Sequence, residues 1–408
     1  MSRACICAAL LLLSVPAFSR EYDLARPQPV YSDSLGYGYE EPRVQGEPFY
    51  FSVKVPDGNY RVSVTLGDGE KAGCTVVRAE SRRLFLEAVS TAAGEYRSFV
   101  FTVNKRSPSF GEGGSVLLNE REKGSFDWDD RLTLEFAGPA PAVRSVTVEP
   151  ASPDVVTVFL CGNSTVVDQR YEPWASWGQM APRWFDEGVA ISNHAESGER
   201  TTSFLARNRL EKVLSMMKPG DFVICEFGHN DQKEHGPGDG AYYNFAHNLK
   251  IFIDKVRAAE GTIVFATPTQ RRRFDAGLTR IEESHEDYPD AMRFVAAKEN
   301  VPVIELHEAT RTFFETLGFE GSRKALVHYP AGTFPGQEKE LADNTHFNPY
   351  GAYEVARMAI QGALDLGLSF TSHLLPDWKA FDPSLPDDPD TFVWYPSTAF
   401  EQTKPLGN

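Results

Sequence analysis

Two distant segments of the sequence hold the side chains needed for acyl transfer. Ser164 follows Gly162 at the end of an apolar run, where glycine allows a tight turn and a helix start favours a developing anion. Asp343 and His346 stand much later, in a predicted loop just before a helix. A serine can attack an ester, a histidine can take its proton, and an aspartate can fix the imidazole tautomer. The residue types and their order therefore predict a triad of Ser164, His346 and Asp343.

Each of these segments also has a simpler interpretation. A serine at a strand-to-helix turn is often only an N-cap, and the late histidine could be a solvated residue at a helix start. Gly198 and Asn230 follow strand-like runs and could donate hydrogen bonds to an oxyanion, although glycine and asparagine also favour plain turns. Taken together and in this order, the segments predict an esterase.

The second half of the chain alternates between strand-like and helix-like patterns. Five apolar strand runs are predicted at 155–161, 188–192, 221–227, 262–266 and 302–306. Helical patterns are predicted at 174–185, 203–217, 242–260 and 348–364. This alternation indicates an α/β fold with a doubly wound parallel sheet, which binds ligands at the carboxyl ends of its strands. The segments with candidate catalytic residues follow predicted strands, so we expect them to meet at one rim.

The first part of the chain differs in texture. Short strand patterns separated by turn clusters such as Pro56-Asp57-Gly58-Asn59 indicate an all-β sandwich. This sandwich could be a galactose-binding-like module that binds carbohydrate, or a rigid lid that shapes the cleft. The predicted organisation is a signal peptide at 1–19, a β-sandwich accessory domain at 20–150, an α/β domain at 154–370 and an extended C-terminal tail at 371–408.

The first nineteen residues have the pattern of a secretory signal peptide. Arg3 provides a basic start, an apolar stretch follows, and Ala17-Phe18-Ser19 is a small-x-small cleavage site. The apolar stretch is too short for a membrane span, so we expect export to the periplasm or the extracellular medium. The formal net charge of -16 disfavours nucleic acid and anionic membranes as partners. Nothing in the sequence indicates an oligomeric state.

The cysteines do not form a recognisable framework. Removal of the signal peptide leaves Cys74, Cys161 and Cys225, an odd number that cannot pair completely. Two of them lie in apolar strand-like runs, where a free cysteine usually behaves as a small buried hydrophobe. No spacing of cysteine and histidine is typical of a zinc site, so we expect no metal and no cofactor.

The four segments in this order resemble the SGNH (GDSL-type) hydrolases, and most strongly their rhamnogalacturonan acetylesterase-like branch. The resemblance covers roughly residues 154–366 and rests on four blocks: Gly162-Asn163-Ser164-Thr165, Gly198, Gly228-His229-Asn230-Asp231 and Asp343-Asn344-Thr345-His346. It implies a flavodoxin-like, metal-free domain with a five-stranded parallel sheet between helices. It also implies the roles of nucleophile for Ser164, base for His346 and orienting acid for Asp343. The implied oxyanion hole consists of the Ser164 and Gly198 backbone N–H groups and the Asn230 amide.

Two positions depart from the family pattern. Asn163 stands where the family usually has aspartate, so the support of the nucleophile loop differs in charge. In the second block, Glu199 lies between the glycine and Arg200, which many relatives carry directly after the glycine. Substrate contacts in that loop are therefore expected to differ.

The resemblance implies a secreted carbohydrate esterase that removes acetyl groups from pectic rhamnogalacturonan through an acyl-serine intermediate. Arg271, Arg272 and Arg273 follow the fourth predicted strand and could bind galacturonate carboxylates, although three consecutive bases could also be a solvated run. Trp177 and Gln232 complete the predicted substrate contacts, with a core role as the alternative for the tryptophan. The alternative functions are an acetylesterase or lipase-like enzyme acting on xylan or another ester, and a glycan-binding protein without catalysis.

Overall fold

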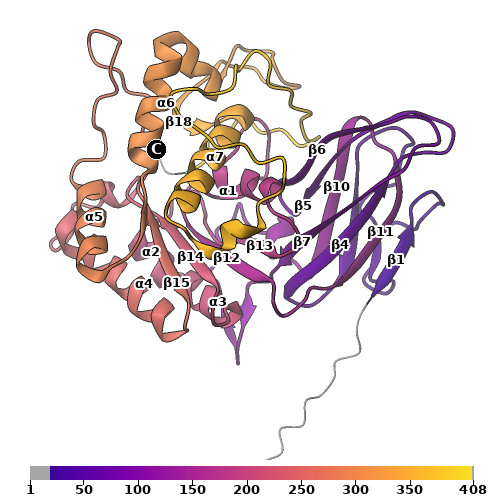
Figure 1. Ribbon diagram of the computed structural model, residues 1–408, viewed down its shortest axis with the longest axis horizontal. Helices are drawn as coiled ribbons and strands as arrows, with labels where there is room; N and C mark the ends of the chain where they lie inside the picture. Colours follow the sequence, from indigo (N-terminus) through magenta and orange to yellow (C-terminus); the bar gives the residue numbers. More distant parts are fainter. Residues whose placement is uncertain (1–18, 407–408) are drawn as a thin grey trace, which may run out of the picture.

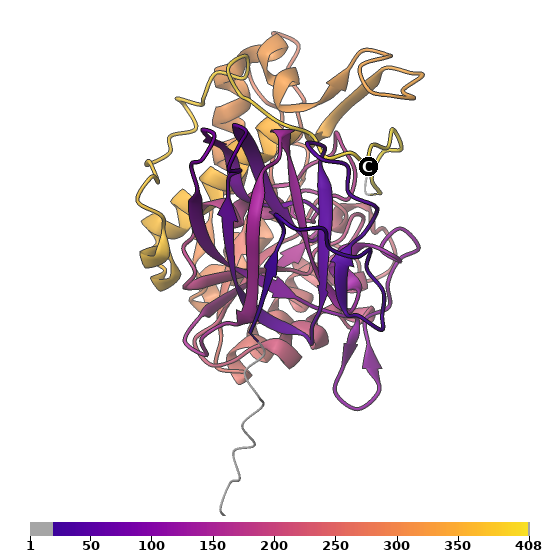
Figure 2. The same ribbon diagram turned by 90° about the vertical axis from the view of Figure 1, so that its right-hand side faces the viewer.

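The computed structural model describes residues 19–406, so the predicted signal peptide lies outside the described residues except for Ser19. A β-sandwich and an α/β domain lie side by side in Figure 1, where the sandwich is drawn in indigo and purple. Figure 2 shows the sandwich from its broad side, in front of the α/β domain. No helix in the described part of the chain combines the length and the apolar character that a membrane span needs.

Two antiparallel sheets form the N-terminal domain, which confirms the predicted sandwich. One has the order β1-β11-β4-β7 and the other β2-β3-β10-β5-β6. Their bounds are β1 Arg20–Asp23, β2 Tyr37–Tyr39, β3 Phe49–Lys54, β4 Gly58–Leu66, β5 Gly73–Ala79, β6 Arg83–Thr91, β7 Arg97–Lys105, β10 Arg131–Ala140 and β11 Val143–Pro150. In β4, Val62, Val64 and Leu66 are buried while the residues between them are partly exposed, as a period of two requires.

Smaller elements complete this domain. The strands β8 (Ser109–Phe110) and β9 (Gly114–Ser115) form a hairpin, and a 3-10 helix spans Phe126–Trp128. Val76, Leu84 and Ala137, on the outer face of the five-stranded sheet, belong to the same buried cluster as residues of the α/β domain. The two domains therefore share a hydrophobic core.

The α/β domain contains a fully parallel sheet, as predicted. Its order is β13-β12-β14-β15-β16, with bounds β12 Val156–Gly162, β13 Val189–Asn193, β14 Phe222–Glu226, β15 Thr262–Ala266 and β16 Val303–Ile304. In chain order this is 2-1-3-4-5, the flavodoxin-like arrangement. The sheet is buried on both faces, which explains why its strands are continuous apolar runs.

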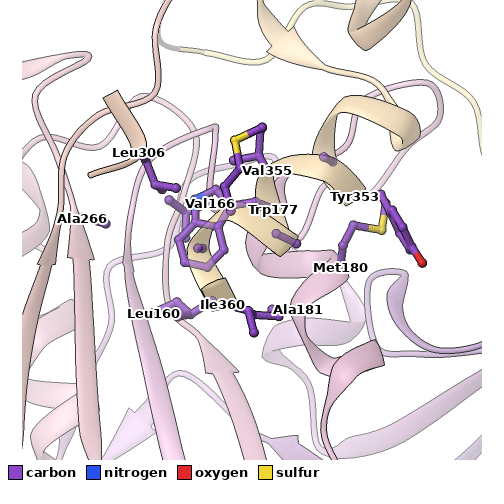
Figure 3. Packing of buried hydrophobic residues seen from close by; sticks show 14 of the residues in the cluster. Leu160, Val166, Trp177, Met180, Ala181, Ala266, Leu306, Tyr353, Val355 and Ile360 are labelled. Atoms are coloured by element: carbon purple, nitrogen blue, oxygen red, sulfur yellow. The ribbon is translucent and has the colours of Figure 1, made fainter. Parts of the chain in front are cut away.

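Helices cover the two faces of this sheet separately. Phe159 and Cys161 face the cluster formed with α2 (Thr201–Ala206), α3 (Arg209–Met216), α4 (Ala246–Ala258) and α5 (Tyr288–Glu299). Leu160 faces the opposite cluster with α1 (Trp177–Met180), α6 (Leu306–Gly321) and α7 (Pro349–Asp365), part of which is shown in Figure 3. Successive residues of β12 thus pack against helices on opposite faces of the sheet.

Several predicted helices are interrupted. The helix predicted at 203–217 is split into α2 and α3, because Asn208 adopts a left-handed conformation with φ of 60°. The helix predicted at 174–185 is only α1 followed by a 3-10 turn at Ala181–Trp184, and the one predicted at 242–260 starts as a π-helix at Ala241–Phe245. Further 3-10 turns span Asp231–Lys233, Ser322–Ala325 and Ser369–His373.

The segment with Asp343 and His346 is a strand rather than the predicted loop. It belongs to β18 (Leu341–Phe347), which pairs with β17 (Leu326–Tyr329) and leads directly into α7. Asp343 Oδ1 accepts hydrogen bonds from the backbone N–H groups of Thr345 (2.7 Å) and His346 (2.9 Å). This local turn bends the end of the strand and lets two side chains three residues apart face each other.

Buried arginines of the sandwich reach into the α/β domain. Arg82 donates hydrogen bonds to the carbonyl oxygens of Gln169 (3.2 Å) and Trp174 (2.8 Å) and pairs with Glu172 at 2.6 Å. Arg83 lies 3.2 Å from the carboxylate of Asp168. These ion pairs are almost fully shielded from solvent, so each charge depends on its partner.

We therefore expect Arg82→Met to lower the free energy of unfolding by about 3–5 kcal/mol, because it leaves the buried Glu172 carboxylate without its cation. Urea denaturation followed by tryptophan fluorescence measures this. Arg26→Met is the matched control, since the Arg26 side chain is 82% exposed. A loss for Arg82→Met no larger than that of the control would contradict the structural role of this ion pair.

Candidate active site

Ser164 lies directly beyond the carboxyl end of β12, an inner strand of the parallel sheet. A Cβ atom at Gly162 would lie 2.6 Å from Val166 Cγ2 and 2.8 Å from the Glu226 carbonyl oxygen, so only glycine fits this approach. The Ser164 carbonyl oxygen accepts hydrogen bonds from Ser176 Oγ (2.6 Å) and Gln169 Nε2 (3.1 Å). The backbone of the candidate nucleophile is therefore fixed from two sides.

The structure brings the three predicted triad residues into one hydrogen-bonded chain. His346 Nε2 lies 2.9 Å from Ser164 Oγ, and His346 Nδ1 lies 2.9 Å from Asp343 Oδ2. A carboxylate can only accept, so Nδ1 carries the hydrogen and Nε2 is free to take the serine proton. Burial alone would raise the pKa of Asp343, but the hydrogen bonds from His346 and Thr345 outweigh it and hold this pKa well below its usual range.

The two other predicted oxyanion residues line one cavity. Gly198 and Asn230 lie on the wall of a cavity of about 360 Å³. Gly198 has φ of 85°, a left-handed conformation that suits glycine. Asn230 Nδ2 donates to the Glu199 carbonyl oxygen (3.1 Å), and Asn230 Oδ1 accepts from Lys233 Nζ (3.0 Å). The amide is thus oriented with its donor on the side of the Gly198 loop.

A buried aspartate joins the second and third blocks. Asp231 accepts hydrogen bonds from the Thr201 backbone N–H (2.7 Å), the Thr201 hydroxyl (2.7 Å) and the Gly228 N–H (3.0 Å). Its burial raises its pKa to about 6 despite these donors. The contacts tie the loop after β14 to the start of α2, and so hold the two oxyanion segments in register.

Asn163 makes a hydrogen bond that the usual aspartate could not. Its Nδ2 donates to the Glu226 carbonyl oxygen (3.3 Å), while its Oδ1 accepts from the Thr165 backbone N–H (3.1 Å). The Glu226 carboxyl group lies beside it and accepts from the Thr165 hydroxyl (2.7 Å) and the Trp177 indole (2.5 Å). A neutral Asn163 therefore avoids a second buried carboxylate next to Glu226.

Trp177 is a core residue, which corrects the prediction of a sugar contact. Only 2% of its surface is exposed, and Figure 3 shows it among Leu160, Val166 and the α7 residue Val355. Its indole N–H is used by Glu226. Trp174 is also buried, and its ring meets the His346 ring edge-on with 5.7 Å between centroids. These buried tryptophans therefore pack against residues of the site, Trp177 against Glu226 and Trp174 against His346.

The three consecutive arginines, predicted as substrate contacts, point in different directions and bind different partners. Arg272 is buried, where its guanidinium donates to Ser322 Oγ (2.9 Å) and Asn344 Oδ1 (3.2 Å) and so supports β18. Arg271 is half-buried and donates to the carbonyl oxygens of Ser284 and His229. Arg273 is exposed and pairs with Glu282 at 3.1 Å. Gln232 is half-buried at the beginning of the segment after Asn230.

One cluster has the residue types of a metal site. Ligating atoms of Glu283, His285 and His307 lie within 4.8 Å of one another. His307 Nδ1 contacts the Pro268 carbonyl oxygen (2.8 Å) and its Nε2 contacts Glu283 (2.7 Å), while the Arg311 guanidinium lies 3.4 Å from the same carboxylate. The His307 imidazole thus lies between two hydrogen-bond acceptors, and the Glu283 carboxylate already has Arg311 as a cationic partner. This arrangement fits a hydrogen-bonded network better than a metal site.

Several residues of the site have a weak signal or none in the sequence. Glu226 left a signal, because it is a charged residue at the end of an otherwise apolar run. Arg82 and Lys404 left none, since their importance comes from contacts across the chain. Lys404 Nζ lies 3.1 Å from Asp343 Oδ2, although 61 positions separate the two residues (404 − 343).

A serine–histidine–aspartate chain at the carboxyl edge of a 2-1-3-4-5 parallel sheet defines a serine hydrolase of the α/β class. The sequence profile of the GDSL-like lipase/acylhydrolase family matches residues 160–353. The chain is 40% identical over 222 residues to rhamnogalacturonan acetylesterase RhgT of Bacillus subtilis (strain 168), a match that covers 54% of this chain and 94% of that protein. The chain belongs to this family and is a carboxylic-ester hydrolase.

Two other similarities extend this comparison. The chain is 28% identical over 225 residues to the probable rhamnogalacturonan acetylesterase YesY of the same organism, covering 54% of this chain and 98% of that protein. The crystal structure of the protein YXIM from Bacillus subtilis matches with a TM-score of 0.48 at 22% identity, covering 86% of this chain and 99% of that chain.

The Glu226 carboxyl group gives the site a pH-dependent stability. Burial raises its pKa to about 7 from the ordinary 4.5, with the Thr165 and Trp177 hydrogen bonds opposing the shift. A raised folded-state pKa means that the stabilisation is complete below about pH 4.5 and is lost as the pH rises through about 7.

We therefore expect Glu226→Gln to gain about 3 kcal/mol of stability relative to the wild type between pH 4.5 and 8, because the neutral amide never has to ionise in the core. Urea unfolding at a series of pH values measures the difference between the two proteins. Any constant cost of the amide cancels in that comparison. A difference that does not change with pH would refute the assignment of a buried, titrating Glu226.

Proposed function

We propose that the protein is an exported carbohydrate esterase that removes O-acetyl groups from a uronate-containing pectic polysaccharide, acetylated rhamnogalacturonan. The observation that carries the substrate class is the charge of the cavity at the oxyanion residues. Arg200, Arg207 and Lys233 line it, against the single carboxylate of Glu199. This cationic lining stands out in a chain with a net charge of -16. Guanidinium groups bind carboxylates in a bidentate manner, as recognition of galacturonate would require.

The lining of the cavity agrees with a polar substrate. Its volume of about 360 Å³ is at the small end for ligand sites. Apart from Gly198 and Leu406, its lining consists of polar or charged residues: Asn119, Ser197, Glu199, Arg200, Ser203, Arg207, Asn230 and Lys233. A long acyl chain would need an apolar channel in place of these groups. This favours an acetylesterase over a lipase.

The proposed reaction follows from the positions of the triad atoms. Ser164 Oγ attacks the acetyl carbonyl carbon while its proton moves to His346 Nε2, and Asp343 stabilises the imidazolium. The Ser164 and Gly198 N–H groups and the Asn230 amide stabilise the negative charge on the carbonyl oxygen. Collapse of this intermediate breaks the ester bond, and His346 gives the proton to the departing sugar oxygen. Water, activated by His346 in the same way, then releases acetate from acetyl-Ser164.

The two relatives reported above support the choice of polymer, since both carry the name rhamnogalacturonan acetylesterase, one as probable. Export is proposed from the sequence of residues 1–19 alone, with the periplasm or the extracellular medium as destination. Mass spectrometry of the N-terminus of the protein recovered outside the cytoplasm tests this part. Retention of the first nineteen residues would oppose it.

We expect the wild-type protein to release acetate from acetylated rhamnogalacturonan and Ser164→Ala to release less than a thousandth as much, because the nucleophile is lost. Acetate is measured enzymatically, and circular dichroism verifies that the variant is folded. Acetylated xylan is the neutral comparison polymer. Release from xylan alone would keep the mechanism and reject the pectic substrate. No release from either polymer by the folded wild type would favour a glycan-binding protein.

The charge of the cavity gives a second test. Arg200 is 40% exposed and pairs with Glu234 at 3.1 Å. We expect Arg200→Gln to lower kcat/KM on the pectic polymer about fivefold, equivalent to ~1 kcal/mol for a partly exposed ion pair, and to leave 4-nitrophenyl acetate hydrolysis unchanged. Arg26→Gln, on a distant exposed side chain, is the control. Equal losses on the charged and uncharged substrates would argue against carboxylate recognition by this arginine.

A further inference from the structure

A segment near the C-terminus is attached to the segment that supports the nucleophile. We call residues 374–406 the C-terminal tail; in Figure 1 it is the yellow trace that crosses the α/β domain. Its backbone forms two hydrogen bonds with Glu172, from the Glu172 N–H to the Ala399 carbonyl (2.9 Å) and from the Glu401 N–H to the Glu172 carbonyl (3.0 Å). The Trp174 indole donates to the Glu401 carbonyl oxygen at 2.9 Å. The tail is thus fixed three residues before Lys404.

Side-chain contacts strengthen this attachment. The Glu172 carboxylate, which pairs with Arg82, also accepts hydrogen bonds from the Trp394 indole and the Ser397 backbone N–H, each at 3.0 Å. Phe400 stacks on Phe334 with 4.7 Å between ring centroids. Glu172 is buried, so the hydrogen bonds from Trp394 and Ser397 are made to a carboxylate away from solvent. Such charge-assisted bonds are strong, and they fix the position of the tail.

Lys404 then lies against the triad itself. Its ammonium group is 3.1 Å from Asp343 Oδ2, the same oxygen that lies 2.9 Å from His346 Nδ1. The Asp343 side chain is 3% exposed and that of Lys404 is 47% exposed, so the lysine stands between the buried pair and solvent. The aspartate therefore serves two positively charged or chargeable partners at one oxygen.

We propose that Lys404 is a positioning residue of the triad, which shares Asp343 with His346 and keeps the histidine unprotonated at a lower pH than a triad without this cation. A positive charge beside Asp343 cancels part of the attraction that the carboxylate exerts on an imidazolium. The neutral imidazole, which is the form that accepts the serine proton, is thereby favoured. The proposal depends on ester hydrolysis by Ser164 and not on the pectic substrate.

The other charged and titratable groups around these residues do not provide the same effect. Lys233 approaches Lys404 from the segment after β14, and partial desolvation together with Arg271, Lys404 and Arg200 lowers its pKa to about 8. His328 faces Asp343 from β17, and His229 faces His346 from the loop after β14. Burial keeps the pKa of His229 well below its ordinary value, so this group is neutral at working pH. Lys404 is the cation in direct contact with Asp343 among the described residues.

The test is the pH dependence of kcat/KM for 4-nitrophenyl acetate, an uncharged ester, at low and high salt. We expect Lys404→Met to move the acid limb of the profile to higher pH by about half a unit at low salt. This is the effect expected of removing one positive charge, screened by water, a few ångströms from the imidazole. High salt should reduce the difference. Lys404→Arg should restore the wild-type profile, because it keeps the charge. Lys379→Met, which removes an exposed lysine of the same tail, should leave it unchanged.

Three outcomes would overturn the proposal: an acid limb that does not move in Lys404→Met, an equal shift in Lys379→Met, or a fall in kcat at every pH without a shift, which would indicate a merely structural role. Nuclear magnetic resonance titration of the His346 imidazole in the same variants gives a readout that does not require turnover. Hydrolysis of 4-nitrophenyl acetate without activity on the pectic polymer would reject the proposed substrate and still decide the role of Lys404.

Discussion

The hydrogen bond between Ser164 and His346 joins two residues that are 182 positions apart, and the arrangement of the α/β domain serves to hold it at 2.9 Å. A single bond of this kind contributes little to stability, so it cannot determine the fold that contains it. The parallel sheet instead places the end of β12 next to the end of β14, where the oxyanion loop starts. The strand β18, which comes much later in the sequence, then places His346 within hydrogen-bonding distance of Ser164.

Buried charges between the domains help to hold the Ser164 loop in the position that this hydrogen bond requires. Arg82 and Glu172 form an ion pair inside the molecule, and their hydrogen bonds reach the backbone of Gln169, Trp174 and the C-terminal tail. Gln169 in turn holds the Ser164 carbonyl oxygen. The β-sandwich is therefore part of the support of the nucleophile loop. The sandwich thus has a structural role beside the two that its sequence leaves open, a carbohydrate-binding module and a rigid lid that shapes the cleft.

Much of the fold could be predicted from the sequence because burial leaves periodic signals. The strands of the parallel sheet are continuous apolar runs, and β4 alternates with a period of two, so both domains were predicted correctly in class. The break between α2 and α3 was missed, since a left-handed Asn208 has no distinctive pattern within a helical stretch. The sequence predicts Asp343 and His346 as a pair but places them in a loop, because the hydrogen bonds that form the end of β18 cannot be read from residue types.

The sequence predicts less about the residues around the triad. The sequence predicts the three arginines after β15 as substrate contacts, but the direction of each side chain depends on its neighbours, such as Ser322 for Arg272 and Glu282 for Arg273. Trp177 was ambiguous between sugar and core, and its indole bond to buried Glu226 decides for the core. Lys404 meets Asp343 only because the tail folds back over the domain, which no local pattern encodes.

Trapping the acyl-enzyme tests whether Ser164 is the nucleophile that His346 activates. The protein is mixed with excess 4-nitrophenyl acetate, quenched in acid within milliseconds and digested, and the peptides are analysed by mass spectrometry. We expect one acetyl group on the peptide with Ser164, located on that side chain by fragmentation, and none in His346→Ala. Rapid hydrolysis with acetyl groups on other residues only, or equal labelling of Ser164 without His346, would contradict it.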